Sequence, residues 1–238
     1  DNYIRLFRDP YVRASLKNTV VFTVITVPLQ TAGSLVLAAV IAELFHNKFG
    51  NFVKSSLFVP VIASAILVGT LWFTLLSPRG VVNSIIHAFG LPSVNWLGGK
   101  LTSMLSVCIV SVWKNVGYFL VIYFAGIMDI PRSLYEAAEV DGANAFQRFF
   151  KITLPGLSSV TFLVVTLGTI WSFQVFDLVY TMTGGGPGTS TVTLVLTTYN
   201  AAFKEYNMGY ASAVAMLMFV FVLAVSGLQK LLLKGGED

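Results

Sequence analysis

Long apolar runs with at most one charged residue each constrain this chain more than any other feature of its sequence. Each run can cross a hydrocarbon layer of roughly 30 Å, which takes about 20 residues of helix. Two of the runs carry one charge each, Lys114 and Asp177. Strands of membrane barrels have about ten residues of alternating polarity, and the runs fit no such pattern. They therefore predict five spanning helices, at residues 19–42, 55–78, 101–128, 156–182 and 206–229.

Composition agrees with this interpretation. Charged residues make up 11% of the 238 residues and hydrophobic residues 55%, whereas a soluble domain carries about 25% charged residues. We expect an all-α integral membrane protein, a polytopic helix bundle forming one domain over residues 1–238, with short interfacial and coupling helices. The net charge of +4 is small and scattered, so no nucleic-acid partner is expected. The lone Cys108 excludes an internal disulfide, and no catalytic or metal-ligating constellation is visible.

The N-terminal segment, residues 1–17, predicts an amphipathic piece that lies along the membrane interface. Its arginines alternate with apolar residues, and Pro10 divides it. Because the chain opens without methionine, we expect a trimmed N-terminus. Lysines and arginines outside the spans divide seven to seven between the two sides of the membrane. Without the N-terminal segment the count is seven to three, which favours a cytoplasmic location for residues 129–155.

Residues 129–155 form the most hydrophilic segment and predict two short helices with a turn at Gly142. Ser133 can cap the first helix, since Glu136 follows at the spacing of a capping box. The second helix is expected from about residue 143 to residue 151. Its apolar stripe either meets a partner protein or packs on the chain's own helices; the stripe consists of Ala145, Phe146, Phe149 and Phe150.

The same segment carries a specific motif. The pattern is Glu136-Ala137-Ala138, then Gly142 after three residues, Ile152 after nine more, and Leu154-Pro155 after one more. It resembles the EAA loop of permease subunits of binding-protein-dependent ABC importers. Every position of that pattern is filled at the family's spacing. The resemblance implies that the loop docks on a cytoplasmic ATPase through Glu136, Ala137, Ala138, Gly142, Ile152, Leu154 and Pro155. It further implies a partner-facing surface that includes Glu139, Phe146, Phe149 and Phe150.

Other stretches resemble the sugar-type branch of that family, with maltose and glycerol-3-phosphate systems as its examples. They are residues 2–3, 111–114, 176–180, 183–187 and 208–213. The resemblance implies a multi-pass subunit in a prokaryotic plasma (inner) membrane that forms half of a translocation pathway. Its partners would be a second permease, cytoplasmic ATPase subunits and an extracytoplasmic solute-binding protein. ATP and magnesium would bind the ATPase, leaving this chain without a cofactor. Such relatives carry one more spanning helix before residue 1, which agrees with a trimmed chain.

Polar residues inside the spans predict the substrate pathway, because polar groups in a membrane are costly and usually functional. Helical spacing places four of them on one face of the third span, where they suit the hydroxyls of a sugar: Ser111, Lys114, Asn115 and Tyr118. Ser172 and Gln174 on the fourth span are weaker candidates. The alternative is that these groups only join helices, with Lys114 paired to Asp177.

Two other functions remain open at this point. In an ion-coupled secondary transporter, Lys114 and Asp177 would be the coupling charges. In a membrane scaffold, the polar stripe would only hold helices together. Neither explains the pattern from Glu136 to Pro155, and the lack of a convincing internal repeat counts against a secondary transporter. The glycines of residues 184–188 lack the Gly-Lys-Ser/Thr ending of a phosphate loop and predict a turn.

Overall fold

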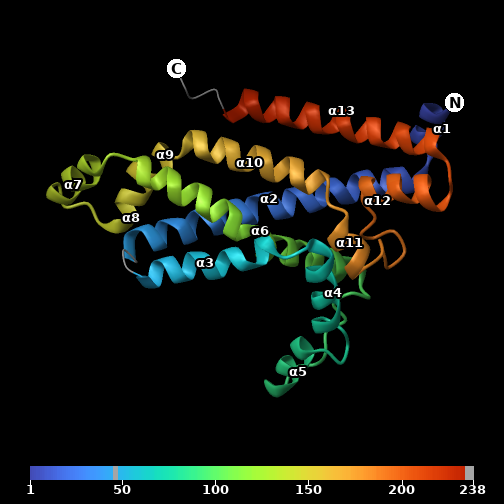
Figure 1. Ribbon diagram of the computed structural model, residues 1–238, viewed down its shortest axis with the longest axis horizontal. Helices are drawn as coiled ribbons and strands as arrows, with labels where there is room; N and C mark the ends of the chain where they lie inside the picture. Colours follow the sequence, from blue (N-terminus) through green and yellow to red (C-terminus); the bar gives the residue numbers. More distant parts are fainter. Residues whose placement is uncertain (45–47, 234–238) are drawn as a thin grey trace.

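The computed structural model describes residues 1–44 and 48–233, and every regular element in this part of the chain is a helix. Four long helices run side by side along the long axis of the molecule (Figure 1): α2 (Pro10–Leu44), α6 (Lys100–Asp129), α10 (Ser158–Phe173) and α13 (Met208–Leu233). Three of them, α2, α6 and α13, are long and apolar enough to cross a membrane alone. The expected all-α polytopic bundle is confirmed, and the count rises to five only if two bent helix pairs each form one span.

The first bent pair replaces the single helix expected over residues 55–78. Helix α3 (Lys48–Ile62) and helix α4 (Ala65–Leu75) meet at an angle of 97°. Pro60 lies inside α3 and cannot donate a backbone hydrogen bond, which weakens the helix just before the break. Past the bend, α4 packs on α11 (Asp177–Met182), where Gly69 lies so close that an added Cβ would be 1.8 Å from Thr181 Oγ1.

The fourth expected span, residues 156–182, is also interrupted. Helix α10 ends at Phe173, and α11 begins separately at Asp177. Before α10 comes a continuous helical stretch, and the two meet at an angle of 69°. This stretch consists of α8 (Ala145–Arg148), a π-helical turn η1 (Phe149–Thr153) and α9 (Leu154–Gly156). The second helix expected in the hydrophilic segment therefore extends past residue 151. Leu157 at the bend is fully buried and anchors this junction in the bundle.

The N-terminal segment is divided at Pro10, as expected, but its second part, residues 10–17, belongs to the first long helix. Helix α1 (Asn2–Arg8) ends before Pro10, whose fixed φ suits the first turn of α2, so residues 10–17 belong to that long helix. Asp9 holds the junction: Oδ1 accepts from the Tyr11 amide at 2.8 Å and Oδ2 from the Tyr210 hydroxyl at 2.5 Å. An interfacial location of α1 stays a prediction.

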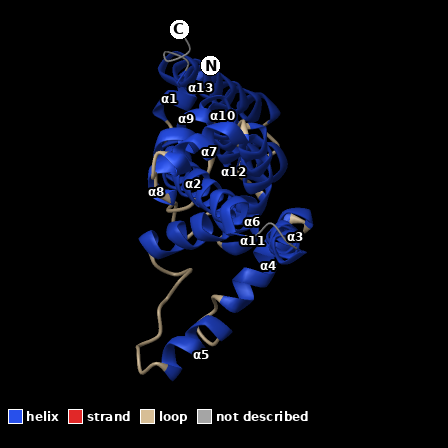
Figure 2. Cartoon of the chain, turned by 90° about the vertical axis from the view of Figure 1, so that its left-hand side faces the viewer, coloured by secondary structure: helices blue, strands red, loops and turns tan. Residues whose placement is uncertain are grey.

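The remaining short helices lie toward the ends of the bundle. Helix α7 (Arg132–Val140) projects at one end, while α12 (Leu194–Tyr199) and its π-helical continuation η2 (Asn200–Lys204) lie at the other (Figure 1). Helix α5 (Val81–Ala88) extends away from the bundle beyond α4 (Figure 2).

Helix packing is most extensive where α2 crosses α6, and a separate core cluster joins α1, η2 and α13. Buried hydroxyls on α2 bond to carbonyls of the preceding turn, such as Thr26 Oγ1 to Phe22 O at 2.7 Å. On α6, Gly117 faces α3 so closely that an added Cβ would lie 2.0 Å from Leu57 O. This packing fixes the polar face of α6 between α3 and α10.

Candidate functional site

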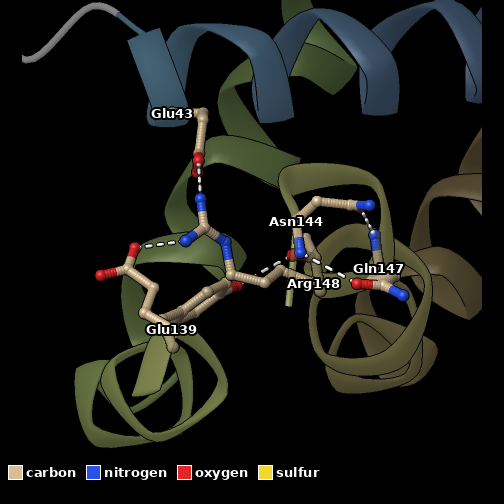
Figure 3. A network of polar contacts seen from close by, with 7 residues as sticks. Glu43, Glu139, Asn144, Gln147 and Arg148 are labelled. Atoms are coloured by element: carbon tan, nitrogen blue, oxygen red, sulfur yellow. Dashed lines mark hydrogen bonds and ion pairs between the residues drawn. The ribbon is translucent and has the colours of Figure 1, made fainter. Parts of the chain in front are cut away.

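The motif-bearing loop begins with α7, whose N-cap is Pro131 and lacks a side-chain cap. The expected cap at Ser133 is wrong, because Ser133 already lies inside the helix. Instead Asn144 and Gln147 form the capping box at the start of α8, each side-chain oxygen accepting from the other's backbone N–H at 2.9 Å (Figure 3). Asn followed three residues later by Gln is itself a capping signal, and sequence reasoning passed over it.

The turn between the helices uses Gly142, as predicted. Its φ of +77° lies in the left-handed region that favours glycine. The amide of Ala143 donates to Ala138 O at 2.8 Å and that of Gly142 to Glu139 O at 3.0 Å, which satisfies the last carbonyls of α7. The loop is therefore a defined helix–turn–helix unit.

The seven motif residues occupy two places. Glu136, Ala137 and Gly142 are exposed on the projecting tip, with Ala138 half-buried beneath them. At the root of the loop, Ile152 and Leu154 are half-buried and Pro155 is exposed, where the chain enters α10. Leu154 packs against the core cluster that includes Phe119, Tyr123 and Leu157. The first part of the motif is therefore exposed at the tip of the loop, and the last part packs at the base of the loop against the bundle.

Part of the aromatic stripe is free to meet a partner protein, and part packs on the chain's own helices. Phe146 and Phe150 are 71% and 48% exposed, and their ring centroids are 4.5 Å apart. Phe149 is half-buried and packs on the core. Val140, at 89% exposed, enlarges the displayed apolar surface, although the sequence did not single it out. A gathered set of exposed apolar side chains on a hydrophilic loop is typical of a protein-binding surface.

Glu139, expected to face a partner, is joined to the chain's own Arg148. The Arg148 guanidinium pairs at once with Glu139 on α7 and with Glu43 at the end of α2 (Figure 3). Sequence reasoning missed Glu43, because it lies 105 residues away. All three side chains line a cavity of about 920 Å³ between α2, the end of α6 and the loop.

A second, smaller cleft of about 180 Å³ lies where both broken helices are interrupted, and exposed residues such as Gln174 and Asp177 form part of its lining. Five of the six residues predicted for the substrate pathway line it: Ser111, Lys114, Asn115, Ser172 and Gln174. Tyr118 is not among the lining residues and packs on Trp171, with ring centroids 4.8 Å apart. Gln30 and Trp171 also line the cleft and were not predicted. An isolated glutamine in the first apolar run was the available signal for Gln30.

The polar contacts of this cleft decide whether Lys114 pairs with Asp177, which the sequence left open. Among the described residues, both ion pairs within 4.0 Å involve Arg148, so Lys114 and Asp177 do not form one although both line the cleft. Lys114 Nζ instead donates to Val61 O at 3.3 Å, at the C-terminal end of α3, where the helix dipole favours a cation.

Ser172 and Asn115 also have partners within the bundle. Ser172 Oγ lies 3.1 Å from Thr26 Oγ1 and joins α10 to α2. Asn115 Nδ2 donates weakly to Ser111 Oγ at 3.5 Å. Gln174 is exposed to the cleft. In the described ranges, no three His, Cys, Asp or Glu residues are grouped so as to hold a metal ion.

Comparison with known proteins shows which family the chain belongs to. A family model described as "Binding-protein-dependent transport system inner membrane component" matches residues 18–235. The chain is 38% identical to the probable ABC transporter permease protein YurN of Bacillus subtilis, covering 100% of this chain and 82% of that protein. It is 36% identical to the sulfoquinovosyl glycerol transport system permease protein SmoG of Agrobacterium fabrum, covering 95% and 73%.

A third relative is the trehalose/maltose transport system permease protein MalF of Thermococcus litoralis, 34% identical over 94% of this chain and 75% of that protein. The fold matches a crystal structure of a bacterial ABC transporter involved in the import of alginate, with a TM-score of 0.91 at 24% identity over 100% and 84% of the two chains. The family model covers most of the chain, and the motif, the helix bundle and the relatives agree with it: this chain belongs to the binding-protein-dependent inner membrane components, the permease subunits of ABC importers.

Proposed function

We propose that this permease carries a sugar or a related polyhydroxy solute through the cleft at the two helix breaks. The cleft combines hydrogen-bonding groups of Ser111, Asn115 and Gln174 with the indole of Trp171. Hydroxyls need hydrogen-bond partners, and an aromatic ring offers an apolar surface to a sugar ring. Relatives named for sulfoquinovosyl glycerol, lactose and trehalose/maltose transport support this solute class.

The volume of the cleft indicates how it would work. About 180 Å³ is small for a disaccharide, because ligand pockets usually enclose at least about 300 Å³. One chain supplies half of the pathway in this proposal, and a second permease supplies the opposite wall. The chain would lie in a prokaryotic inner membrane with its extracytoplasmic solute-binding protein at the end opposite α7 (Figure 1).

ATP and magnesium would bind a separate cytoplasmic ATPase that docks on the tip of the loop. The exposed Phe146 and Val140 provide apolar contact, and Glu136 provides a carboxylate for a basic group of the ATPase. A ligand shifts a conformational equilibrium only if it has different affinities for the two conformations. ATP would therefore act by favouring the permease conformation in which the loop fits the closed ATPase. The ion-coupled alternative has no observation in its favour, and family membership opposes it.

Co-purification tests this proposal. The chain would be expressed with its neighbouring permease and ATPase, and residues 133–151 would be replaced by a flexible Gly/Ser linker in a matched variant. We expect the ATPase to follow the wild-type chain and to be lost with the linker while both permeases stay together. Retention of the ATPase by the linker variant would refute docking through this loop. For the solute, titrating the cognate binding protein with neutral and anionic sugars identifies the class, and binding of amino acids alone would refute a sugar.

A further inference from the structure

The pairing of Arg148 connects three elements that are far apart in the sequence. Its guanidinium contacts Glu139 near the end of α7 and Glu43 in the last turn of α2 (Figure 3). The loop is joined covalently to α6 and to α10, which flank it in the chain, but α2 has no covalent link to it. The ion pair with Glu43 therefore supplies a polar connection from the loop to the helix at the centre of the bundle.

The Arg148 side chain is held in place from several directions. The capping box fixes the first turn of α8, and the glycine turn fixes α8 relative to α7. The side chain is only 15% exposed, against 44% for Glu43 and 60% for Glu139. A planar guanidinium with five donors can hold two carboxylates at once, which a lysine cannot do in the same geometry. Arg148 thus locks both loop helices to one point on α2.

Helix α2 is the element that would transmit a movement of the loop to the cleft. It packs along α6 and α10, which carry the polar residues of the cleft, and its own Gln30 lines that cleft. Gln30 lies 13 residues before Glu43, about 20 Å along the helix axis. A displacement of the loop that moved Glu43 would reach the wall of the cleft through a continuous helix.

We propose that Arg148, with Glu43 and Glu139, forms a clasp that makes α2 move together with the ATPase-docking loop. Arg148 is a positioning residue in this scheme, because it contacts neither solute nor nucleotide. The clasp rests on the proposed function, since the loop must be driven by an ATPase for its motion to matter. Because both carboxylates are exposed to solvent, the two ion pairs contribute little to stability, and we expect the effect in the coupled motion and not in folding.

A distance measurement in the assembled importer tests the clasp. Spin labels at Leu29→Cys on α2 and Lys151→Cys in η1 occupy exposed positions, and the buried Cys108 would stay unlabelled. The probe is MgATP with vanadate. In the wild-type background we expect the distance between the two labels to stay unchanged on adding the probe. With Glu43→Gln it should shift by about 2 Å or more, the scale of helix shifts at moving interfaces.

Two further variants make the result specific. Asp129→Asn removes an exposed carboxylate at the cytoplasmic end of α6 and should behave as wild type. The triple reversal Glu43→Arg, Glu139→Arg and Arg148→Glu rebuilds both pairs with opposite signs and should restore the constant distance. A constant distance in Glu43→Gln, or the same shift in wild type, would overturn the clasp.

Capture of the ATPase by each labelled variant separates the two proposals. If Glu43→Gln captures the ATPase as well as wild type does, the loop is folded and docked, and the distance result applies to the clasp alone. If wild type captures no ATPase, docking through the loop is refuted and the clasp loses its role with it.

Discussion

Replacing Gly117 by alanine tests how tightly α3 must pack on α6 for the cleft to form. The added Cβ would lie 2.0 Å from Leu57 O and 2.7 Å from Leu57 C, both backbone atoms that no side-chain rotation can move. Real Cβ contacts essentially never fall below 3.0 Å, so α3 and α6 must separate by at least 1.0 Å locally. A gap of that size forfeits a quarter to a half of the dispersion energy of the atoms across it.

We expect Gly117→Ala to lower the free energy of unfolding by about 1–3 kcal/mol, the usual cost of overpacking. Since about 1 kcal/mol corresponds to 2–4 °C for chains of this size, the Tm should fall by several degrees. The hydrogen bond from Lys114 Nζ to Val61 O is already 3.3 Å long and should be lost when α3 moves. Thermal unfolding of the purified importer, followed by tryptophan fluorescence, measures the shift.

Gly33→Ala is the matched control at a neighbouring helix crossing. Its Cβ would lie 3.7 Å from Val116 Cγ2, an ordinary contact, so nothing has to move. Alanine favours a helix over glycine by up to about 1 kcal/mol, and the Tm should stay level or rise. Equal Tm changes in the two variants, or an unchanged Tm for Gly117→Ala, would refute the argument from close packing.

Three more predictions concern the two sites. Phe146→Ala should leave the Tm within about 1 °C, because the ring is 71% exposed, but should weaken ATPase capture; unchanged capture would remove this ring from the docking surface. Asn144→Ala should cost about 1 kcal/mol by removing the cap of α8, seen as faster hydrogen exchange over residues 145–148, and equal exchange would contradict the capping role. Asn115→Ala should reduce solute uptake several-fold with ATPase capture intact, whereas full uptake would place the pathway elsewhere.

Much of this protein is determined locally and can be predicted from its sequence. Apolar runs specify helices because no other backbone arrangement of that length satisfies its own hydrogen bonds in a membrane. The turn at Gly142 follows from glycine's access to positive φ, and the spacing from Glu136 to Pro155 resembles the EAA loop of the family to which the chain belongs. The gathering of Ser111, Lys114 and Asn115 on one cleft also follows, because helical periodicity alone places them on one face.

Contacts between distant segments were decided by the tertiary structure. The 97° bend between α3 and α4 was not predicted, because Pro60 weakens a helix without fixing the direction of the chain after it. In the folded chain α4 packs on α11, and Lys114 donates to the end of α3. Glu43 and Arg148 meet across 105 residues, and no local pattern links them. The sequence left open whether Lys114 pairs with Asp177 for the same reason: the ammonium donates instead to a backbone carbonyl at the end of α3, which only the folded structure brings beside it. Periodicity and propensity act within one helix, while the choice of partner depends on which helices lie side by side.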